Sequence, residues 1–191
     1  DHDKFFVTFT EFLNDSKINV REISSYYVGC GPGSFTGIRK VVAFVKALII
    51  TNFRKNIVSL SVNSLAIMAY QYYYQNPNAK SNVVLSALDT QSGDYYVQLF
   101  LCNKHFDFLL NPISNIEIIN LKKLKHFLDK FNINQKKLKI LGLIGKEVDS
   151  DQINFAENIS LYPTASYLGK LAFHLQTFEK NKSKLQLNHK F

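Results

Sequence analysis

The chain alternates between stretches in which apolar residues recur at helical spacing and short apolar runs typical of strands. The helical spacing predicts helices over 3–13, 34–52, 64–75 and 121–131, and a last helix over 164–178. The short runs predict strands over 23–28, 57–60, 83–88, 95–102, 106–110, 116–119 and 140–144. Because strands alternate with helices and hairpins follow in the second half, the pattern predicts an α/β fold.

Polar segments rich in turn-forming residues separate these elements. They predict turns or loops at 15–17, 54–56, 91–94, 103–104 and 149–158, and a frayed polar end over 180–191. The sequence Asn76-Pro77-Asn78 is the best candidate for a linker. We therefore predict a first lobe over 1–78 and a second over 79–191, with the 164–178 helix as a candidate to pack back on the first.

The most unusual stretch is 29–37, which holds four of the eight glycines between a predicted strand and a predicted helix. A glycine turn at a helix N-terminus can bind phosphate through free N–H groups. The segment has neither a Gly-Lys-Ser/Thr ending nor G-x-G-x-x-G spacing, which favours a tight turn that lets the helix pack closely. Ser34 or Thr36 is expected to cap that helix, as Ser61 or Asn63 is for the 64–75 helix.

Composition excludes some classes of protein. The 191 residues are 46% hydrophobic, yet no apolar run approaches twenty residues, so no membrane partner is expected. Two cysteines are too few for a disulfide framework, which favours the cytoplasm, and Cys30 is expected to be a small packed thiol rather than a nucleophile. The net charge of +8 suits an anionic partner. A general abundance of lysine in the composition explains this charge slightly better than an anionic partner does, because the lysines are dispersed along the chain.

Few residues have the spacing of a catalytic or metal site. The five histidines are not paired at ligand spacing, so no protein-built metal site is expected. Asp89 follows an apolar strand and is either a catalytic carboxylate or, more often at such positions, a residue that bonds its own turn. Met68 and the tyrosines of 70–74 are expected to be packing residues.

Two motifs resemble those of a known family. The nine residues 31–39, Gly-Pro-Gly-Ser-Phe-Thr-Gly-Ile-Arg, resemble the signature of the TsaB (YeaZ) family, bacterial proteins needed to make threonylcarbamoyladenosine in tRNA. The strand 83–90 with the turn after it is similar to the family's second motif, in which Asp89, Gly93 and Tyr96 match. Tyr162-Pro163-Thr164-Ala165 is similar more loosely. The resemblance implies an actin-like ATPase (ASKHA, ribonuclease-H-like) fold with two lobes.

The chain departs from that family at both ends. Members begin with a strand of the type Ile-Leu-Ala-Ile-Asp-Thr and a hairpin, whereas this sequence begins with a predicted helix. We therefore expect an N-terminally truncated member whose first lobe lacks its N-terminal strands. The edge of the 23–28 strand would be open, and the apolar face of the 34–52 helix uncovered. The family's closing Pro-x-Tyr-Leu-Arg is not readable in 185–191.

The resemblance implies a non-catalytic partner of TsaD, which transfers threonylcarbamoyl to the tRNA adenosine adjacent to the anticodon. It implies a TsaE-like ATPase as a further partner, with tRNA bound through the complex. No catalytic, cofactor or metal site is expected on this subunit; ATP and metal are expected on the partners. The 3–13 and 36–50 helices would contact TsaD or a second copy of the chain.

The residues expected at that contact are Phe6, Phe9, Phe35, Thr36 and Arg39, although packing inside the chain is equally expected for the phenylalanines. The turn residues Gly31, Pro32, Gly33, Ser34 and Gly37 would allow close approach rather than bind phosphate. One alternative is an enzyme on the same fold, either a nucleotide-dependent transferase or a glycoprotease-like metallopeptidase. Another is a truncated product without function.

Overall fold

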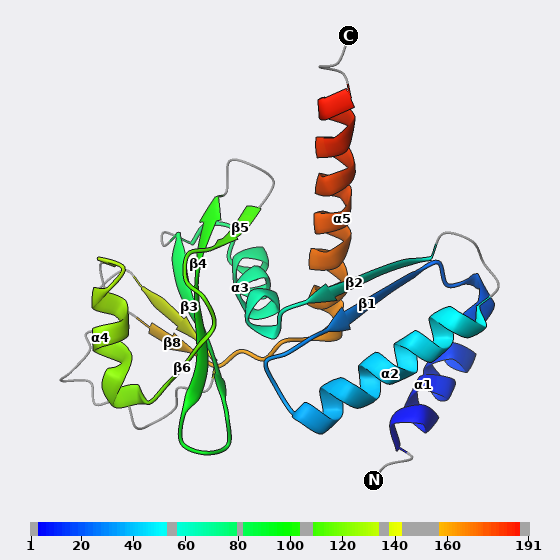
Figure 1. Ribbon diagram of the computed structural model, residues 1–191, viewed down its shortest axis with the longest axis horizontal. Coiled ribbons are helices and arrows are strands. Elements are labelled where there is room, and N and C mark those ends of the chain that lie inside the picture. The colour runs from blue at the N-terminus through cyan, green and yellow to red at the C-terminus, as the bar shows by residue number, and fades with distance from the viewer. Residues whose placement is uncertain are drawn as a thin grey trace.

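The computed structural model describes residues 4–52, 57–79, 82–103, 109–133, 138–142 and 157–187. In the first part of the chain the elements are α1 (Lys4–Asp15), the 3-10 turn η1 (Val20–Glu22), β1 (Ser25–Gly29), α2 (Phe35–Thr51), β2 (Val58–Val62) and α3 (Ser64–Gln75). The strands β1 and β2 pair in parallel as a two-stranded sheet. The α2 helix connects them and lies beside α1 (Figure 1).

The second part of the chain builds a six-stranded sheet in the order β5-β4-β3-β7-β8, with β6 paired to β4. Its elements are β3 (Val83–Asp89), β4 (Tyr95–Asn103), β5 (Leu109–Pro112), β6 (Glu117–Ile119), η2 (Leu121–Lys123), α4 (Leu124–Asp129), β7 (Lys139–Leu141), β8 (Glu157–Ile159) and α5 (Ala165–Leu187). The β3–β4 pair is an antiparallel hairpin, whereas β3–β7 and β7–β8 are parallel.

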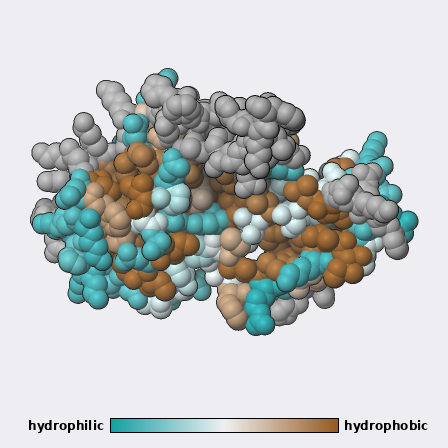
Figure 2. Space-filling model, turned by 45° about the horizontal axis from the view of Figure 1, so that its top comes forward, coloured by the Kyte–Doolittle hydropathy of each residue, from teal (hydrophilic) through white to brown (hydrophobic). Residues whose placement is uncertain are grey.

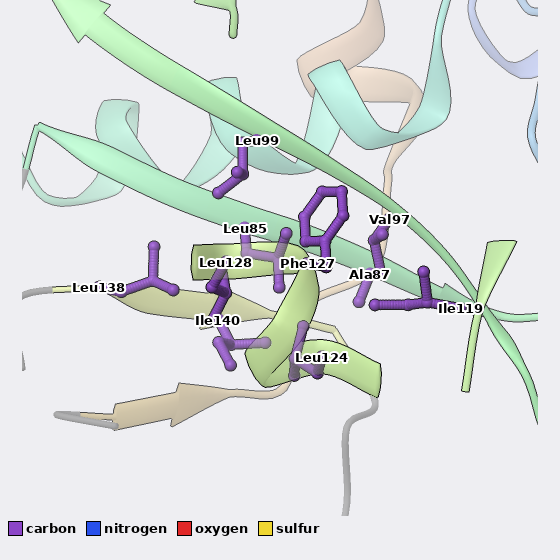
Figure 3. Packing of buried hydrophobic residues seen from close by; sticks show 10 residues of the cluster. All are labelled: Leu85, Ala87, Val97, Leu99, Ile119, Leu124, Phe127, Leu128, Leu138 and Ile140. Atoms are coloured by element: carbon purple, nitrogen blue, oxygen red, sulfur yellow. The ribbon is translucent and has the colours of Figure 1, made fainter. Parts of the chain in front are cut away.

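The β3 strand is buried on both sides, because helices cover both faces of the larger sheet. Alternate residues of a strand point to opposite faces. Leu85 and Ala87 accordingly pack with Phe127 and its neighbours on α4 (Figure 3). Val84 packs with the residues of α3 on the other face. The prediction of a buried strand from the largely apolar run at 83–88 is confirmed.

The α3 helix belongs to two hydrophobic clusters. One side packs on β3 and β4 through Leu65, Met68 and Tyr73, and another packs on β2 and α5 through Ile67 and Tyr70. The expectation that Met68 and its neighbouring tyrosines are packing residues is confirmed, since Met68 is fully buried and Tyr74 lies at the rim.

The α5 helix packs against β1, β2 and α3 with its first half. The Tyr27 hydroxyl donates a 2.6 Å hydrogen bond to Gln176 Oε1 across this contact. The second half of α5 extends away from both sheets (Figure 1). The proposed division of the chain near residue 78 stays a prediction.

Several predicted segments differ from the structure. The helix predicted over 121–131 is a 3-10 turn over Leu121–Lys123 followed by the short α4 helix over Leu124–Asp129. The loop predicted over 149–158 includes the start of β8, which forms through parallel pairing with β7 rather than through a local apolar pattern. The last helix continues to Leu187, beyond the predicted end at 178, because the Lys, Leu and Gln residues that follow are good helix formers. The strand predicted over 106–110 is observed from Leu109 and continues to Pro112, beyond its predicted end.

Several other sequence predictions fall outside the described residues. They are the loop at 54–56, Lys104 of the predicted turn, residues 106–108 of the predicted 106–110 strand, the residues of the predicted 140–144 strand beyond Gly142, residues 149–156 of the predicted loop, and the C-terminal residues 188–191.

Candidate functional site

The glycine turn joins β1 to α2, and its backbone is bonded to the elements beside it. The Cys30 N–H donates to the Val62 carbonyl at 2.9 Å, at the end of β2. The Gly31 carbonyl accepts from the Ser64 N–H at 2.7 Å, at the first residue of α3. The turn is therefore held between β2 and α3, and it sets where α2 begins.

The requirement for glycine is strongest at Gly31. Its φ of +97° lies in the left-handed region, which disfavours other residues. A Cβ at this position would lie 2.8 Å from Ile38 Cδ1, so the turn and the first turn of α2 approach closely here. Gly33 and Gly37 have more room, since an added Cβ would come no closer than 3.4 Å to another group. Pro32 follows Gly31 through a cis peptide bond.

Ser34 is the N-cap of α2. Its Oγ accepts a 3.3 Å hydrogen bond from the Gly37 N–H, and its carbonyl accepts from the Ile38 N–H. Between the two candidates Ser34 and Thr36, the structure selects Ser34, and Thr36 lies exposed in the first turn. For the 64–75 helix it selects Asn63, whose Oδ1 accepts from Leu65 and Ala66.

The phenylalanines of α1 pack around one residue of α2. Phe5, Phe6 and Phe9 each place their rings edge-on against Phe44, with centroids 4.9–5.3 Å apart. The Phe9 side chain is partly buried in this cluster, whereas the Phe6 side chain keeps 45% of its surface exposed. Phe44 was missed by sequence reasoning, although its helical spacing from Val41 and Leu48 places it on the apolar face.

The outward face of α2 is exposed. Phe35 is 72% exposed and Ile50 is 82% exposed, and no residue of either α1 or α2 is buried. The Arg39 guanidinium lies 4.9 Å from the centre of the Phe35 ring. Figure 2 shows hydrophobic residues at the surface of the part of the molecule that holds α1 and α2, next to hydrophilic ones. Phe35 and Arg39 thus lie together on the exposed face, and Thr36 is exposed on the same helix. Phe9 packs on Phe44, and its expected role at a contact stays a prediction.

The prediction for Cys30 is wrong, because its side chain is exposed rather than packed. Its backbone is fixed by the bond to Val62, and the side chain points outward from the turn between β1 and α2. Cys102 on β4 is the buried one.

The second motif forms the β3–β4 hairpin turn. The Asp89 Oδ1 accepts from the Gln91 N–H at 2.6 Å, so this carboxylate bonds its own turn, as the more common of the two interpretations predicts. Gly93 has a φ of +89°, which the turn requires. Tyr96 pairs with Leu88 across the hairpin and packs against the α3 side of the sheet.

A polar chain links the end of the first sheet to the second. The Asn63 Nδ2 donates to the Gln98 Oε1 at 2.6 Å, and the Gln98 Nε2 donates to the Ser114 carbonyl at 3.0 Å. Asn63 and Gln98 border a pocket of about 180 Å³ that apolar residues of β4, β5 and α5 also line. Sequence reasoning missed Gln98; the signal was a polar residue at an inward position of the alternating strand 95–102.

Two buried tyrosines of α3 have shifted pKa values. Burial raises the pKa of Tyr73 far above its ordinary value, and the nearby Cys102 and Tyr72 add to the effect. Burial also raises the pKa of Tyr70, with a smaller contribution from Tyr74. Both phenols therefore stay protonated wherever the protein is folded at physiological pH.

Within the described ranges, no group of three or more His, Cys, Asp or Glu side chains is placed to hold a metal ion. In the same part of the chain, no helix is both long and apolar enough to cross a membrane.

Comparisons with known proteins place this arrangement in a family. Residues 3–100, just over half of the 191, match the model of the family described as TsaD: tRNA N6-adenosine threonylcarbamoyltransferase. The matched region contains α1, the glycine turn, α2 and the β3–β4 hairpin. The sequence matches no curated protein.

Two solved structures from Pseudomonas aeruginosa have the same fold. One is a protein described as similar to the peptidase YeaZ, with a TM-score of 0.68 and 18% identity over 92% of this chain and 76% of that one. The other is YeaZ itself, with a TM-score of 0.66 and 19% identity over 90% of this chain and 75% of that one. The chain therefore belongs to the TsaD family, and its two-sheet α/β structure is the actin-like (ASKHA) fold of YeaZ (TsaB), as its glycine motif predicts.

Proposed function

We propose that this chain acts in the synthesis of threonylcarbamoyladenosine in tRNA, as a non-catalytic partner of a TsaD-type catalytic subunit. Membership of the TsaD family supports a role in this modification of tRNA. The observation that carries the partner role is the pair of helices α1 and α2, which contain no buried residue although α2 is rich in Val, Ile, Leu and Phe. Exposed apolar surface of this kind marks an interaction site.

The physical argument concerns what stabilises a helix. In a globular protein most helical stability comes from packing an apolar face, not from intrinsic propensity. The α2 helix packs on α1 through Phe44 and contacts β1, yet Phe35 and Ile50 stay exposed on its outward face. Docking against helices of another subunit buries these side chains and completes the packing of α1 and α2.

The proposal also assigns the rest of the assembly. The transfer to the tRNA adenosine takes place on the TsaD-type subunit, which holds the metal, and a TsaE-like ATPase supplies the ATP-driven step. The tRNA is bound by the whole complex in the cytoplasm. The glycine turn supports the contact, because its bonds to Val62 and Ser64 fix the position from which α2 starts.

The rival proposal is an enzyme on the same fold, a nucleotide-dependent transferase or a peptidase. The similarity of one structural relative to a protein described as a peptidase favours it. Calorimetry of the purified chain with ATP, with and without Mg²⁺, separates the two. Tight binding by the isolated chain favours the enzyme; no heat of binding, together with binding to the TsaD-type subunit, favours the partner role.

The experiment that tests the partner role is G37W. Gly37 is exposed in the first turn of α2, and an added Cβ reaches only Ser34, at 3.4–3.5 Å, so a large side chain projects outward without disturbing the fold. We expect the Kd for the TsaD-type subunit of the same organism to rise about tenfold or more, because the indole keeps the partner helix at a distance. Co-purification and calorimetry measure it.

The matched control is G169W, a glycine-to-tryptophan change on α5, where an added Cβ meets no group within 4 Å. It is expected to leave the Kd unchanged. Undiminished association of the G37W variant, at unchanged melting temperature, counts against the proposed contact.

A further inference from the structure

The segment from η2 to β7 concentrates lysine. Residues 121–139 hold seven of the chain's 23 lysine and arginine residues but one of its 15 aspartate and glutamate residues. They make up about a tenth of the sequence, so basic residues, although they occur throughout the chain, are enriched about threefold here. A general abundance of lysine therefore does not account for this segment.

The packing of α4 turns its lysines outward. The side chains that α4 buries against the larger sheet are Leu124, Phe127 and Leu128 (Figure 3). Successive residues of a helix are rotated by about 100°, so the residues between these apolar ones face solvent. Three lysines of η2 and the first turn of α4 are accordingly exposed, and we call them the basic face: Lys122, Lys123 and Lys125.

The charges of the basic face are not neutralised by carboxylates. Lys130, just after α4, forms an ion pair with Glu117, with 3.9 Å between Nζ and Oε2. None of the three lysines of the basic face has such a pair in the described part of the chain. The acidic residue of α4, Asp129, lies at the end of the helix, a full turn after Lys125. Because like charges so close together are destabilising, an anionic partner is favoured at this face.

The surroundings of the basic face favour a nucleic acid over a protein as that partner. Protein interfaces have an apolar centre and are depleted in lysine. Within the described ranges, none of the large exposed apolar side chains lies on η2 or α4, and the nearest in sequence is Ile118 on β6. Exposed lysines neutralise phosphates as mobile point charges and release the counterions of a nucleic-acid backbone. The resulting affinity does not depend on base sequence.

The position of the basic face leaves the rest of the molecule accessible. The α4 helix packs on the larger sheet, whereas α2 contacts β1 of the smaller one. Figure 1 shows α4 at the opposite end of the molecule from α1 and α2. A polyanion bound at α4 therefore leaves α1 and α2 free to contact another subunit.

We propose that the basic face binds the phosphate backbone of RNA directly, without reading its sequence. In the complex it holds the tRNA while α1 and α2 contact the TsaD-type subunit. This inference rests on the proposed function for the identity of the RNA, because that function leaves the tRNA to the complex as a whole. Phosphate contacts fix register and orientation rather than specificity, so the role of this face is to orient the tRNA.

The variant K122Q/K125Q tests this contact in the full chain. Fluorescence anisotropy with a labelled tRNA transcript measures the Kd at salt concentrations between about 0.05 and 0.2 M. We expect the Kd at about 0.05 M to rise about tenfold. The slope of log K against log salt becomes shallower by about two, roughly one for each lost phosphate contact. K122R/K125R keeps both charges and is expected to keep the wild-type Kd and slope.

The matched control is K17Q/R21Q, which removes the same charge at two exposed residues between α1 and β1. It is expected to change the Kd by less than about twofold and to leave the slope unchanged, because these residues are far from the basic face. Equal losses for the two double variants would assign binding to net charge and overturn the proposal. So would a wild-type chain that does not bind tRNA at about 0.05 M salt, or K122Q/K125Q binding like wild type.

A second titration separates an RNA contact from a contact with an acidic protein. If K122Q/K125Q loses affinity for the purified TsaD-type subunit and keeps its affinity for tRNA, the basic face is a protein contact and the proposal is wrong. The tRNA titration uses this chain alone, so its outcome does not depend on that subunit. If the wild-type chain does not bind the subunit, the proposed function fails. If the two double variants do not differ in tRNA binding, only the RNA contact fails.

Discussion

Gly142 directly follows β7, at a point where the backbone lies against β3. Its φ of +116° is in the left-handed region, and an added Cβ would overlap the Ala87 carbonyl oxygen and lie 3.0 Å from Met68 Cε. Both the positive φ and the lack of room for a Cβ require glycine here. We therefore expect Gly142→Ala to lower the free energy of unfolding by about 2–5 kcal/mol. Urea denaturation at equilibrium measures it.

Two other glycines are the controls for this prediction. Gly93 also has a positive φ, but an added Cβ there meets nothing within 4 Å, so Gly93→Ala is expected to cost only about 1–2 kcal/mol. Gly169 lies in α5 with open space around it, so Gly169→Ala is expected to stabilise by up to about 1 kcal/mol. Equal effects at Gly142 and Gly93 would show that the overlap with Ala87 is relieved by a small shift.

At the scale of elements, the attachment of α1 depends on one aromatic side chain. Phe44 contacts the rings of Phe5, Phe6 and Phe9, and no residue of α1 is buried. We expect Phe44→Ala to weaken the attachment by about 1–3 kcal/mol, less than the full loss of a buried phenylalanine, because the cluster is partly exposed. Faster amide hydrogen exchange in α1, with unchanged exchange in β3 and β4, is the expected observation.

The matched control is Phe35→Ala on the same helix. Phe35 is 72% exposed and its only ring contact among the described residues is with Arg39, so its loss leaves exchange in α1 unchanged. Faster exchange with Phe35→Ala, or no change with Phe44→Ala, would contradict the aromatic attachment.

At the scale of the whole molecule, α3 connects the two sheets. Its residues pack on β3 and β4 in one cluster and on β2 and α5 in another. Tyr73 is fully enclosed and its hydroxyl has no hydrogen-bond partner among the described residues. The stability of the folded chain therefore depends on the Tyr73 hydroxyl staying protonated.

The pKa values of Tyr70 and Tyr73 are raised in the folded chain, so the stability of the fold decreases at alkaline pH. Unfolded tyrosine ionises near pH 10, whereas the buried phenols keep their protons. Stability is fully present below about pH 10 and falls above it, by up to about 1.4 kcal/mol per pH unit from Tyr73, while Tyr70 acts in the same direction. We expect Tyr73→Phe to make this fall shallower without loss of stability at pH 7, as measured by urea midpoints between about pH 9 and 11. An identical alkaline slope in the variant would assign the effect to other groups.

The sequence by itself determined the local elements and the family motif. The apolar run at 83–88 predicts a buried strand, and the spacing of apolar residues predicts α1, α2 and α3 with ends close to those observed. The glycine motif identifies the family and the actin-like fold. These features depend on neighbours within a few residues, because hydrophobic periodicity and capping act locally.

Only the tertiary structure decided the features that depend on distant segments. The β8 strand exists through pairing with β7, and α3 became the link between two sheets through contacts on two of its sides. Cys30 proved exposed, and Phe9 packs on Phe44 while Phe35 faces outward. The sequence is compatible with each of these residues being either buried or exposed. Their burial depends on which distant segments of the chain pack against them.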